Sequence, residues 1–164
     1  MEKRPQLQPI TATDVPVVER LWQLYSHDMS EARGTLPDAE GAFKAGRLPT
    51  YLDDSAARGY LISYRDAPAG FAFVRVLPGE TRTMGDFFVV RAARRKRVGY
   101  DVARELLTRH PGRWEIGFQM ENDGAPEFWR RVATDAVGRE WREELRAVPG
   151  KPHIPHDHFI VFDV

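Results

Sequence analysis

The sequence contains no cysteine among its 164 residues. Disulfide bonds, zinc sites built on thiolates and cysteine nucleophiles are therefore excluded. Net charge is absent as well, because 24 basic residues balance 24 acidic ones. Domains dedicated to nucleic acid are usually basic overall, so this balance argues against a nucleic-acid partner.

Long hydrophobic runs are also missing. No stretch approaches the roughly 20 apolar residues of a membrane-spanning helix, and the start, MEKRPQLQPI, has no apolar core of a secretion signal. We therefore expect a cytoplasmic protein with no membrane partner. The apolar share of 42% and the charged share of 29% are those of an ordinary soluble globular protein. The length fits one domain over residues 1–164.

The periodicity of the apolar residues predicts a mixed α/β fold. Helical spacing predicts helices over residues 14–30, 98–109 and 125–137, and a short helix around residues 39–45. A period of two predicts a hairpin of two strands over residues 59–66 and 67–77. Further strands are predicted over residues 7–10, 81–90, 113–120, 140–148 and 158–164.

Residues 89–107, VVRAARRKRVGYDVARELL, join a predicted strand to a predicted helix through a basic turn. Five of the seven residues from Arg91 to Arg97 are basic. The first N–H groups of a helix lack partners within it, and the helix dipole favours negative charge there. The arrangement suits a phosphate group, although a solvated basic turn is the alternative. Neither a Walker A loop nor a glycine-rich dinucleotide fingerprint is present.

Two segments resemble motifs of the GCN5-related N-acetyltransferase (GNAT) family. The family carries Gln/Arg-x-x-Gly-x-Gly/Ala between its fourth strand and the next helix. Arg94 matches the first position and Gly99 the last, while Arg97 replaces the middle glycine. The family also often carries Asn-x-x-Ala-x-x-Phe-Tyr after its fifth strand. The matching residues are Asn122, Ala125, Phe128 and, in place of tyrosine, Trp129.

The resemblance implies a mixed, mostly antiparallel central sheet of about seven strands, flanked by helices and open between its fourth and fifth strands. It implies acetyl-CoA as co-substrate and no metal. Backbone groups of Phe88, Val89 and Val90 would bind the pantetheine arm, besides their place in the sheet core. The pyrophosphate would meet Arg94, Arg95, Lys96, Arg97, Val98, Gly99 and Tyr100. Asn122, Phe128 and Trp129 would line the pantetheine and thioester end, although Asn122 is equally suited to cap the next helix.

Two departures from the family pattern affect the chemistry. If Arg97 needs a positive φ, its side chain costs on the order of 1 kcal/mol or more. We favour a helical φ, with the side chain turned toward a phosphate. Trp129 replaces a tyrosine that often protonates the departing sulfur, and an indole N–H donates a hydrogen bond without giving up its proton.

The family reaction is attack of a neutral amine on the thioester in a ternary complex. Asp86, within MGDFFVV, is the predicted base or substrate-binding carboxylate. The alternative places it on a solvated strand face or at a bulge beside Gly85. Glu115 is a second candidate, and we expect Tyr25 and His27, with the neighbouring Asp28, to border the acceptor pocket.

HIPHDHF carries three histidines and an aspartate, but at no standard metal spacing, so no metal site is predicted. The favoured interpretation is an N-acetyltransferase acting on a small-molecule or protein amine. The alternatives are an acyl-CoA-binding domain without turnover and a nucleic-acid module. Edge strands near the C-terminus would allow a homodimer.

Overall fold

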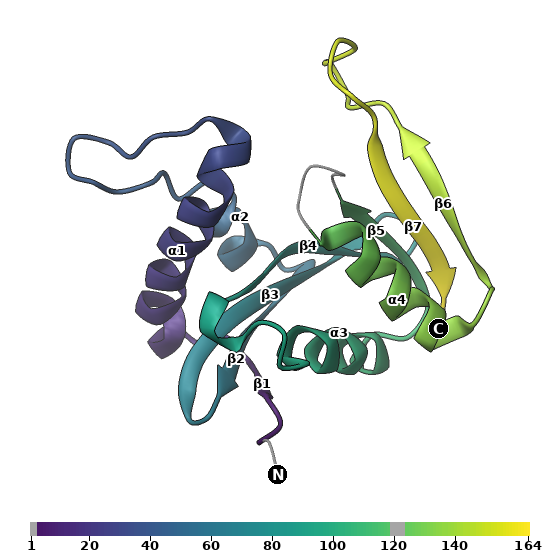
Figure 1. Cartoon of the computed structure of the whole chain (residues 1–164), viewed down its shortest axis with the longest axis horizontal. Helices are drawn as coiled ribbons and strands as arrows, with labels where there is room; N and C mark the ends of the chain where they lie inside the picture. Colours follow the sequence, from purple (N-terminus) through teal and green to yellow (C-terminus); the bar gives the residue numbers. More distant parts are fainter. Residues whose placement is uncertain (1–2, 119–123) are drawn as a thin grey trace. The chain divides into compact units, whose positions relative to one another are not determined.

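The computed structural model describes residues 3–118 and 124–164 (Figure 1). Its strands are β1 (Gln6–Pro9), β2 (Ala57–Tyr64), β3 (Ala67–Leu77), β4 (Thr81–Val89), β5 (Arg113–Phe118), β6 (Trp141–Arg146) and β7 (Asp157–Asp163). Its helices are α1 (Val15–Arg33), α2 (Leu48–Asp53), α3 (Val98–Arg109) and α4 (Ala125–Val137), with short 3-10 turns η1 (Ala12–Asp14) and η2 (Arg91–Ala93).

The strands form a seven-stranded sheet in the order β1-β2-β3-β4-β5-β7-β6. Antiparallel ladders join β1 to β2, β2 to β3, β5 to β7 and β6 to β7. β4 and β5 are parallel, and their ladder sets Arg82 beside Trp114. The predicted mixed, mostly antiparallel sheet with flanking helices is therefore confirmed.

The chain divides into two compact units, which we describe one at a time. The first consists of residues 1–75 and 85–102, and the second of residues 76–84 and 103–164. Among the described residues, no helix is long and apolar enough to cross a membrane.

Most predicted elements are confirmed. The helices over residues 98–109 and 125–137 have the predicted bounds, and α1 covers the helix expected over residues 14–30. The short helix expected around residues 39–45 is wrong. There, the Asp38 carboxylate accepts the backbone N–H groups of Glu40 and Ala42 at 2.9 and 3.0 Å. An aspartate that bonds nearby N–H groups favours a turn over a helix.

Local signals determine both ends of α1. The Asp14 carboxylate accepts the backbone N–H of Thr11 at 2.9 Å, and Pro16 lies in the first turn. At the other end Gly34 has φ 62°, and its N–H donates to the Ser30 carbonyl. A left-handed glycine of this kind ends a helix without a steric penalty from a Cβ.

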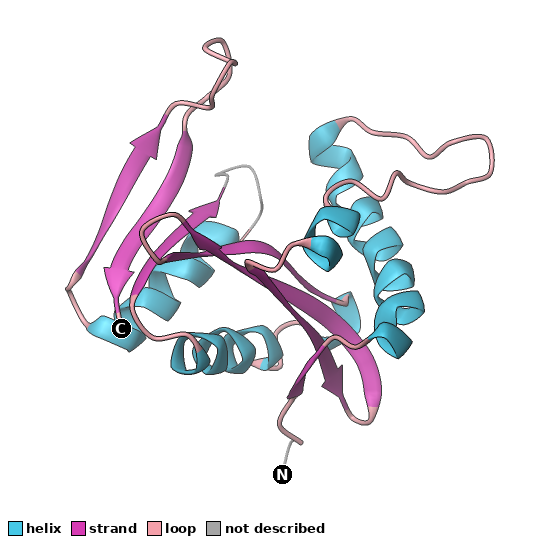
Figure 2. Ribbon diagram, turned by 180° about the vertical axis from the view of Figure 1, so that it is seen from behind, coloured by secondary structure: helices cyan, strands magenta, loops and turns pink. Residues whose placement is uncertain are grey.

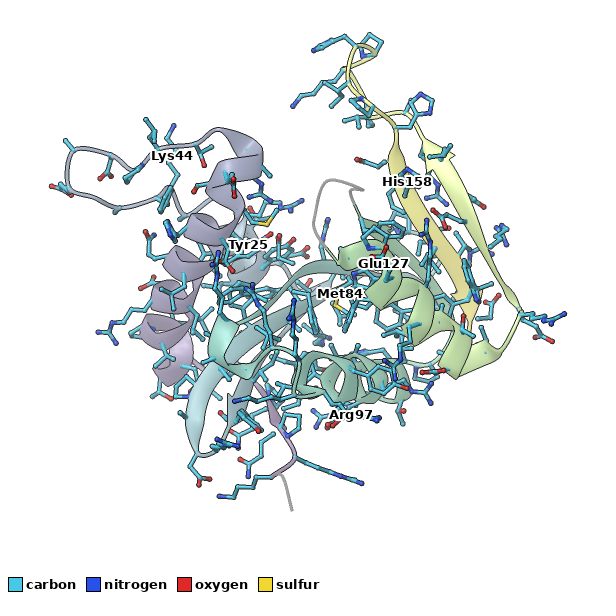
Figure 3. All side chains as sticks on the ribbon, viewed as in Figure 1. Tyr25, Lys44, Met84, Arg97, Glu127 and His158 are labelled. Carbon is cyan, nitrogen blue, oxygen red and sulfur yellow. The ribbon has the colours of Figure 1, made fainter. Side chains whose placement is uncertain are left out.

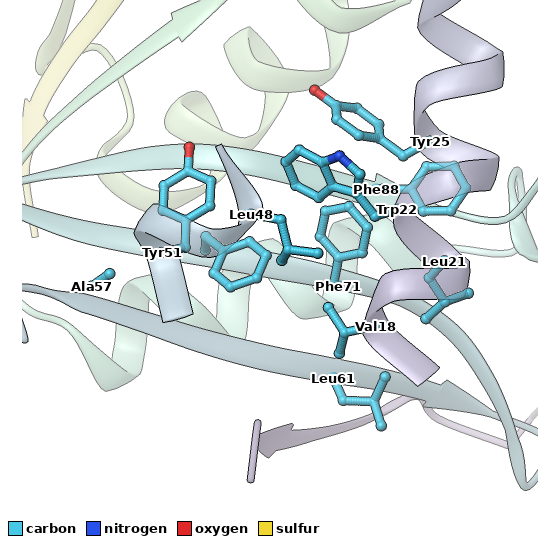
Figure 4. Packing of buried hydrophobic residues seen from close by; sticks show 11 residues of the cluster. Val18, Leu21, Trp22, Tyr25, Leu48, Tyr51, Ala57, Leu61, Phe71 and Phe88 are labelled. Atoms are coloured by element: carbon cyan, nitrogen blue, oxygen red, sulfur yellow. The ribbon is translucent and has the colours of Figure 1, made fainter. Parts of the chain in front are cut away.

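The core of the first unit is rich in aromatic rings (Figure 4), which come from the helices α1 and α2 and from strands; Figure 2 colours helices cyan and strands magenta. Trp22 stacks on Phe71 with ring centroids 5.3 Å apart, and Tyr51 stacks on Phe73 at 4.5 Å. The cluster fixes α1 and α2 against the sheet. It thereby fixes the place of the two tyrosine hydroxyls, Tyr25 and Tyr51, which leave the cluster on the same side (Figure 4).

The second unit has its own core on β5 and β7. Trp114, Ile116 and Ile160 are fully buried there, and the Trp114 indole N–H donates to the His110 carbonyl at 2.9 Å. β6 pairs with β7 through six residues, from Trp141 beside Phe162 to Arg146 beside Asp157.

Candidate functional site

Asp86 is a buried carboxylate on β4. Its residue exposure is 4%, and it belongs to the same strand face as the buried Phe88. The alternative that Asp86 lies on a solvated strand face is therefore wrong. A buried carboxylate needs hydrogen-bond partners, since removing it from water is costly.

Three side chains from distant parts of the sequence supply those partners. Tyr25 of α1 donates to Oδ1 of Asp86 at 2.5 Å, and Tyr51 of α2 donates to Oδ2 at 2.7 Å. Arg47, just before α2, donates to Oδ1 at 3.0 Å. Tyr25 and Asp86 were both predicted site residues, and the structure brings them into direct contact. Tyr51 and Arg47 were not predicted.

Gly85 leaves the room that the Tyr51 hydroxyl needs. A Cβ on Gly85 would lie 2.6 Å from that oxygen, closer than real Cβ contacts allow. A glycine inside a strand often marks such a close approach. The pair Gly85-Asp86 was therefore the one local signal for a bulky partner opposite β4.

Both tyrosines remain protonated at neutral pH. Burial, with the negative charge and hydrogen bond of Asp86, raises the pKa of Tyr25 to about 12. The same causes raise the pKa of Tyr51. Burial alone would lower the pKa of Arg47, but the charge and hydrogen bond of Asp86, together with smaller contributions from Tyr51 and Tyr25, raise it. The cluster is thus one carboxylate held by two neutral donors and one cation.

This cluster borders a pocket of about 280 Å³ in the first unit. The pocket is lined by Trp22, Ser26, Arg33, Lys44, Arg47 and Asp86. The guanidinium of Arg33 lies 3.4 Å from the Tyr25 hydroxyl and covers the Tyr25 ring at 5.7 Å. Tyr25 therefore separates the Arg33 cation from the Asp86 carboxylate. His27 is exposed, with its ring 6.3 Å from that of Phe43.

Some backbone groups at the end of β4 already have partners within the protein. The Val90 N–H donates to Ala69 at 2.8 Å, and the Val90 carbonyl accepts from Ala93 at 2.9 Å. The N–H and the carbonyl of Val90 thus each have one partner within the protein, and the role of Val90 toward pantetheine stays a prediction. The Phe88 carbonyl also faces β3, because it lies 2.0 Å from where a Cβ on Gly70 would be. Backbone groups alternate between strand edges, so those of Val89 face the other edge.

The basic turn follows with two arginines in the left-handed region. Arg95 and Arg97 both have φ 60°. The favoured helical φ for Arg97 is therefore wrong, because the turn keeps the conformation for which glycine is suited. The Arg97 carbonyl accepts the N–H of Asp101 at 2.8 Å, so the first turn of α3 begins there. The Arg97 side chain points along the helix, 5.0 Å from the Tyr100 ring centroid and 3.9 Å from Asp101 (Figure 3).

Arg95, Lys96 and Arg97 are exposed, whereas Val98 is buried and begins α3. The first N–H groups of a helix, here those of Val98, Gly99 and Tyr100, have no carbonyl four residues back within it. The turn therefore combines these backbone donors with three cationic side chains. That combination is suited to bind a phosphate group.

Asp28 connects the basic turn to α1. Its carboxylate accepts from Arg91 at 3.0 Å and also pairs with Arg94. Arg94 donates in addition to the Val89 carbonyl at 2.7 Å. Burial alone would raise the pKa of Asp28, but the hydrogen bonds and charges of Arg94 and Arg91 lower it. Arg94 thus holds the turn in place with its guanidinium.

The remaining predicted site residues belong to the second unit. Trp129 is buried on α4, and its ring lies edge-on to that of Phe128 at 4.8 Å. Glu115 on β5 accepts from Arg146 at 2.6 Å and from Arg113 at 3.3 Å, and the Arg146 hydrogen bond lowers its pKa. Asn122 lies outside the described residues, and the N-cap position of α4 is Gly124.

The histidine segment contributes one ring to a polar contact. Nδ1 of His158 lies 2.8 Å from the Glu143 carboxylate, and its ring stacks on Phe118 at 5.7 Å. Within residues 3–118 and 124–164, no group of three or more histidine and carboxylate side chains is placed to hold a metal ion.

Comparisons with known proteins give matches in structure only. No protein-family model matches the sequence, and no curated protein matches it. An acetyltransferase from Thermus thermophilus has a TM-score of 0.70 at 17% identity, with all of both chains covered. A GNAT family acetyltransferase from Elizabethkingia anophelis, solved with acetyl-CoA bound, has a TM-score of 0.69 at 13% identity, covering 99% of this chain and 100% of the other.

A third similar structure is a ribosomal-protein-alanine N-acetyltransferase from Escherichia coli. Its TM-score is 0.60 at 13% identity, and the match covers 96% of this chain and 91% of the other. The likeness extends over nearly the full length of every one of these proteins. The chain therefore has the fold of the GNAT family acetyltransferases.

Proposed function

We propose that this chain is an acyl-CoA-dependent N-acetyltransferase that transfers the acetyl group of acetyl-CoA to an amine. The observation that carries the proposal is the full-length likeness to an acetyltransferase holding acetyl-CoA. The basic turn supports it, because Arg97 stands at the middle glycine of the family motif and has the left-handed φ that suits glycine. The acceptor is a small-molecule or protein amine.

The basic turn is the proposed pyrophosphate site. Backbone N–H groups at the start of α3 would bind the phosphate oxygens, and Arg95, Lys96 and Arg97 would add charge. The Val89 N–H at the end of β4 is the proposed partner of the pantetheine arm, since the Val89 carbonyl accepts from Arg94. Phe128 and Trp129 remain proposed contacts near the thioester.

In the proposed reaction the neutral amine attacks the thioester carbonyl carbon. A C–N bond forms, the C–S bond breaks, and CoA leaves as a thiolate. A thiol has a pKa of roughly 8.5, so the thiolate is a tolerable leaving group without an acid such as tyrosine at the position of Trp129. Holding the two reactants side by side supplies much of the acceleration.

Asp86 is the proposed acceptor of the proton that the amine loses. A carboxylate offers about four acceptor positions. Tyr25 and Arg47 use two on Oδ1, and Tyr51 uses one on Oδ2. The remaining position on Oδ2 is suited to an N–H of the amine or to a water that carries its proton.

Amine-dependent release of CoA tests the proposal. A thiol reagent reports only the CoA formed, because the chain contains no cysteine. We expect CoA release that depends on amine and exceeds hydrolysis without amine. Asp86→Asn should lower turnover, whereas Asp53→Asn, an exposed position of α2 with the same loss of charge, should not. Full turnover in Asp86→Asn would show that the proton acceptor is another group.

A binding domain without turnover is the second candidate, and the specific observation that favours it is tryptophan at position 129 in place of the family's tyrosine. Saturable binding of acetyl-CoA without CoA release for any amine would identify this case.

A further inference from the structure

The pocket beside Asp86 carries an excess of positive charge. Arg33, Lys44 and Arg47 line it together with a single carboxylate, Asp86. All four residues belong to the first unit. At neutral pH this leaves two positive charges that the pocket's own carboxylate does not balance.

Arg47 is the cation that balances Asp86. Its guanidinium donates to the carboxylate at 3.0 Å, and Tyr25 and Tyr51 satisfy the same carboxylate as neutral donors. The charge of Asp86 is thus compensated inside the cluster. Arg33 and Lys44 are therefore the two surplus cations.

Contacts with Tyr25 hold Arg33 at the pocket wall. One Arg33 nitrogen lies 3.4 Å from the Tyr25 hydroxyl, and the guanidinium stacks over the ring. A neutral tyrosine satisfies one of five guanidinium N–H donors and leaves the charge uncompensated. An arginine oriented in this way presents the planar fork that suits a carboxylate or a phosphate.

Lys44 is the second surplus cation. It lies in the segment between α1 and α2 (Figure 3), and no carboxylate of residues 3–118 or 124–164 is within ion-pair distance of it. Lysine acts as a mobile point charge toward an anion. Trp22 adds an apolar wall beside the two cations.

We propose that this pocket selects an acceptor amine that also carries an anionic group, either a carboxylate or a phosphate. The inference rests on the proposed acyl transfer, and it deepens that proposal by naming the class of acceptor. Arg33 and Lys44 bind the anionic group through charge-assisted hydrogen bonds, and Trp22 covers the apolar part of the molecule. The amine is left free to approach Asp86 and the thioester.

Matched pairs of amines that differ by one anionic group test the inference. Phenylalanine against phenethylamine probes a carboxylate, and phosphoethanolamine against ethanolamine probes a phosphate. We expect kcat/KM for CoA release to be at least about tenfold higher for the anionic member of one pair. The pair that shows the preference tells which anion the pocket takes.

Substitution of Lys44 tests whether a preference for anionic amines comes from this pocket. Lys44→Gln should lower kcat/KM for the preferred anionic amine by about threefold to tenfold, because the lost pair is partly exposed, and should lower it less for the partner that lacks the anionic group. Lys3→Gln is the matched control, since Lys3 pairs with Asp66 instead. Equal loss in both lysine variants would overturn the assignment.

Product binding gives a readout that does not depend on turnover. With CoA present, N-acetylphenylalanine should bind more tightly than N-acetylphenethylamine by ligand-observed NMR, and Lys44→Gln should reduce the difference, since Arg33 remains. Equal binding of the two products, or binding of neither, together with no anionic preference in either amine pair, overturns the inference. If acetyl-CoA binds and amines without an anionic group release CoA equally well, the proposed function stands and only the anionic acceptor fails.

Discussion

The left-handed backbone at Arg97 predicts that glycine at this position is more stable than alanine. Both replacements remove the Arg97 side chain, with its contacts to the Tyr100 ring and to Asp101. They differ only in the Cβ, which alanine keeps at φ 60°. Comparing the two variants therefore isolates the conformational cost from the loss of the exposed contacts.

The magnitude follows from two opposing terms. A residue with a Cβ in the left-handed region costs about 1–2 kcal/mol. Glycine avoids this cost, but it also increases the conformational entropy of the unfolded chain, which lowers the free energy of unfolding by about 0.4–1 kcal/mol relative to alanine. Arg97→Gly should therefore be about 0.5–1 kcal/mol more stable than Arg97→Ala. For a chain of this length that difference raises the midpoint of thermal unfolding by roughly 1–4 °C.

Thermal and urea unfolding of the two variants measure this difference. Lys96 is a matched control, because its φ is not among the positive values of the described residues. At Lys96 the order should reverse, with alanine more stable than glycine. If Arg97→Gly is the less stable variant at position 97, the turn does not have the left-handed conformation. Acetyl-CoA affinity of Arg97→Gly should stay within a few-fold of the parent, since Arg95, Lys96 and the backbone N–H groups remain.

Three further predictions concern the cluster around Asp86. Asp86→Asn should lower the free energy of unfolding by about 2–3 kcal/mol, because it removes hydrogen bonds to a buried charge, and urea unfolding would show this; a loss below 0.5 kcal/mol would contradict it. Gly85→Ala should displace the Tyr51 hydroxyl and cost roughly 1–3 kcal/mol, whereas a neutral effect would mean that β4 shifts freely. Burial and the Asp86 carboxylate raise the pKa of Tyr25 from the ordinary tyrosine value of about 10 to about 12 in the folded state, so the contribution of Tyr25 to stability is present below pH 10 and is lost as the pH rises to 12. Stability should fall more steeply over this range in the parent than in Tyr25→Phe, and parallel curves would refute the coupling.

Most of the regular structure could be predicted from the sequence because periodicity is local. The stripes of residues 98–109 and 125–137 give α3 and α4 their predicted bounds. The helix expected around residues 39–45 does not form because the Asp38 side chain accepts the backbone N–H groups of Glu40 and Ala42, which composition alone does not reveal. The helical φ expected for Arg97 is wrong for a related reason. The turn between β4 and α3 closes only with a left-handed φ at this residue, which arginine itself does not favour.

The candidate site was predicted in part. Asp86 and Tyr25 were each proposed from their positions on predicted elements, but nothing in the sequence joined residues 61 positions apart. Tyr51 and Arg47 were missed because they come from α2 and the segment before it, whose place against β4 depends on the aromatic core. Gly85 beside Asp86 was a local sign of a bulky neighbour, although it could not identify Tyr51.

Thermal unfolding with acetyl-CoA tests the central claim most directly. A ligand at about 100 times its dissociation constant stabilises the folded state by about 2.7 kcal/mol. For a chain of 164 residues this corresponds to a rise in the unfolding midpoint of roughly 5–10 °C. The account predicts such a saturable rise with acetyl-CoA. An unchanged midpoint up to millimolar acetyl-CoA would contradict it.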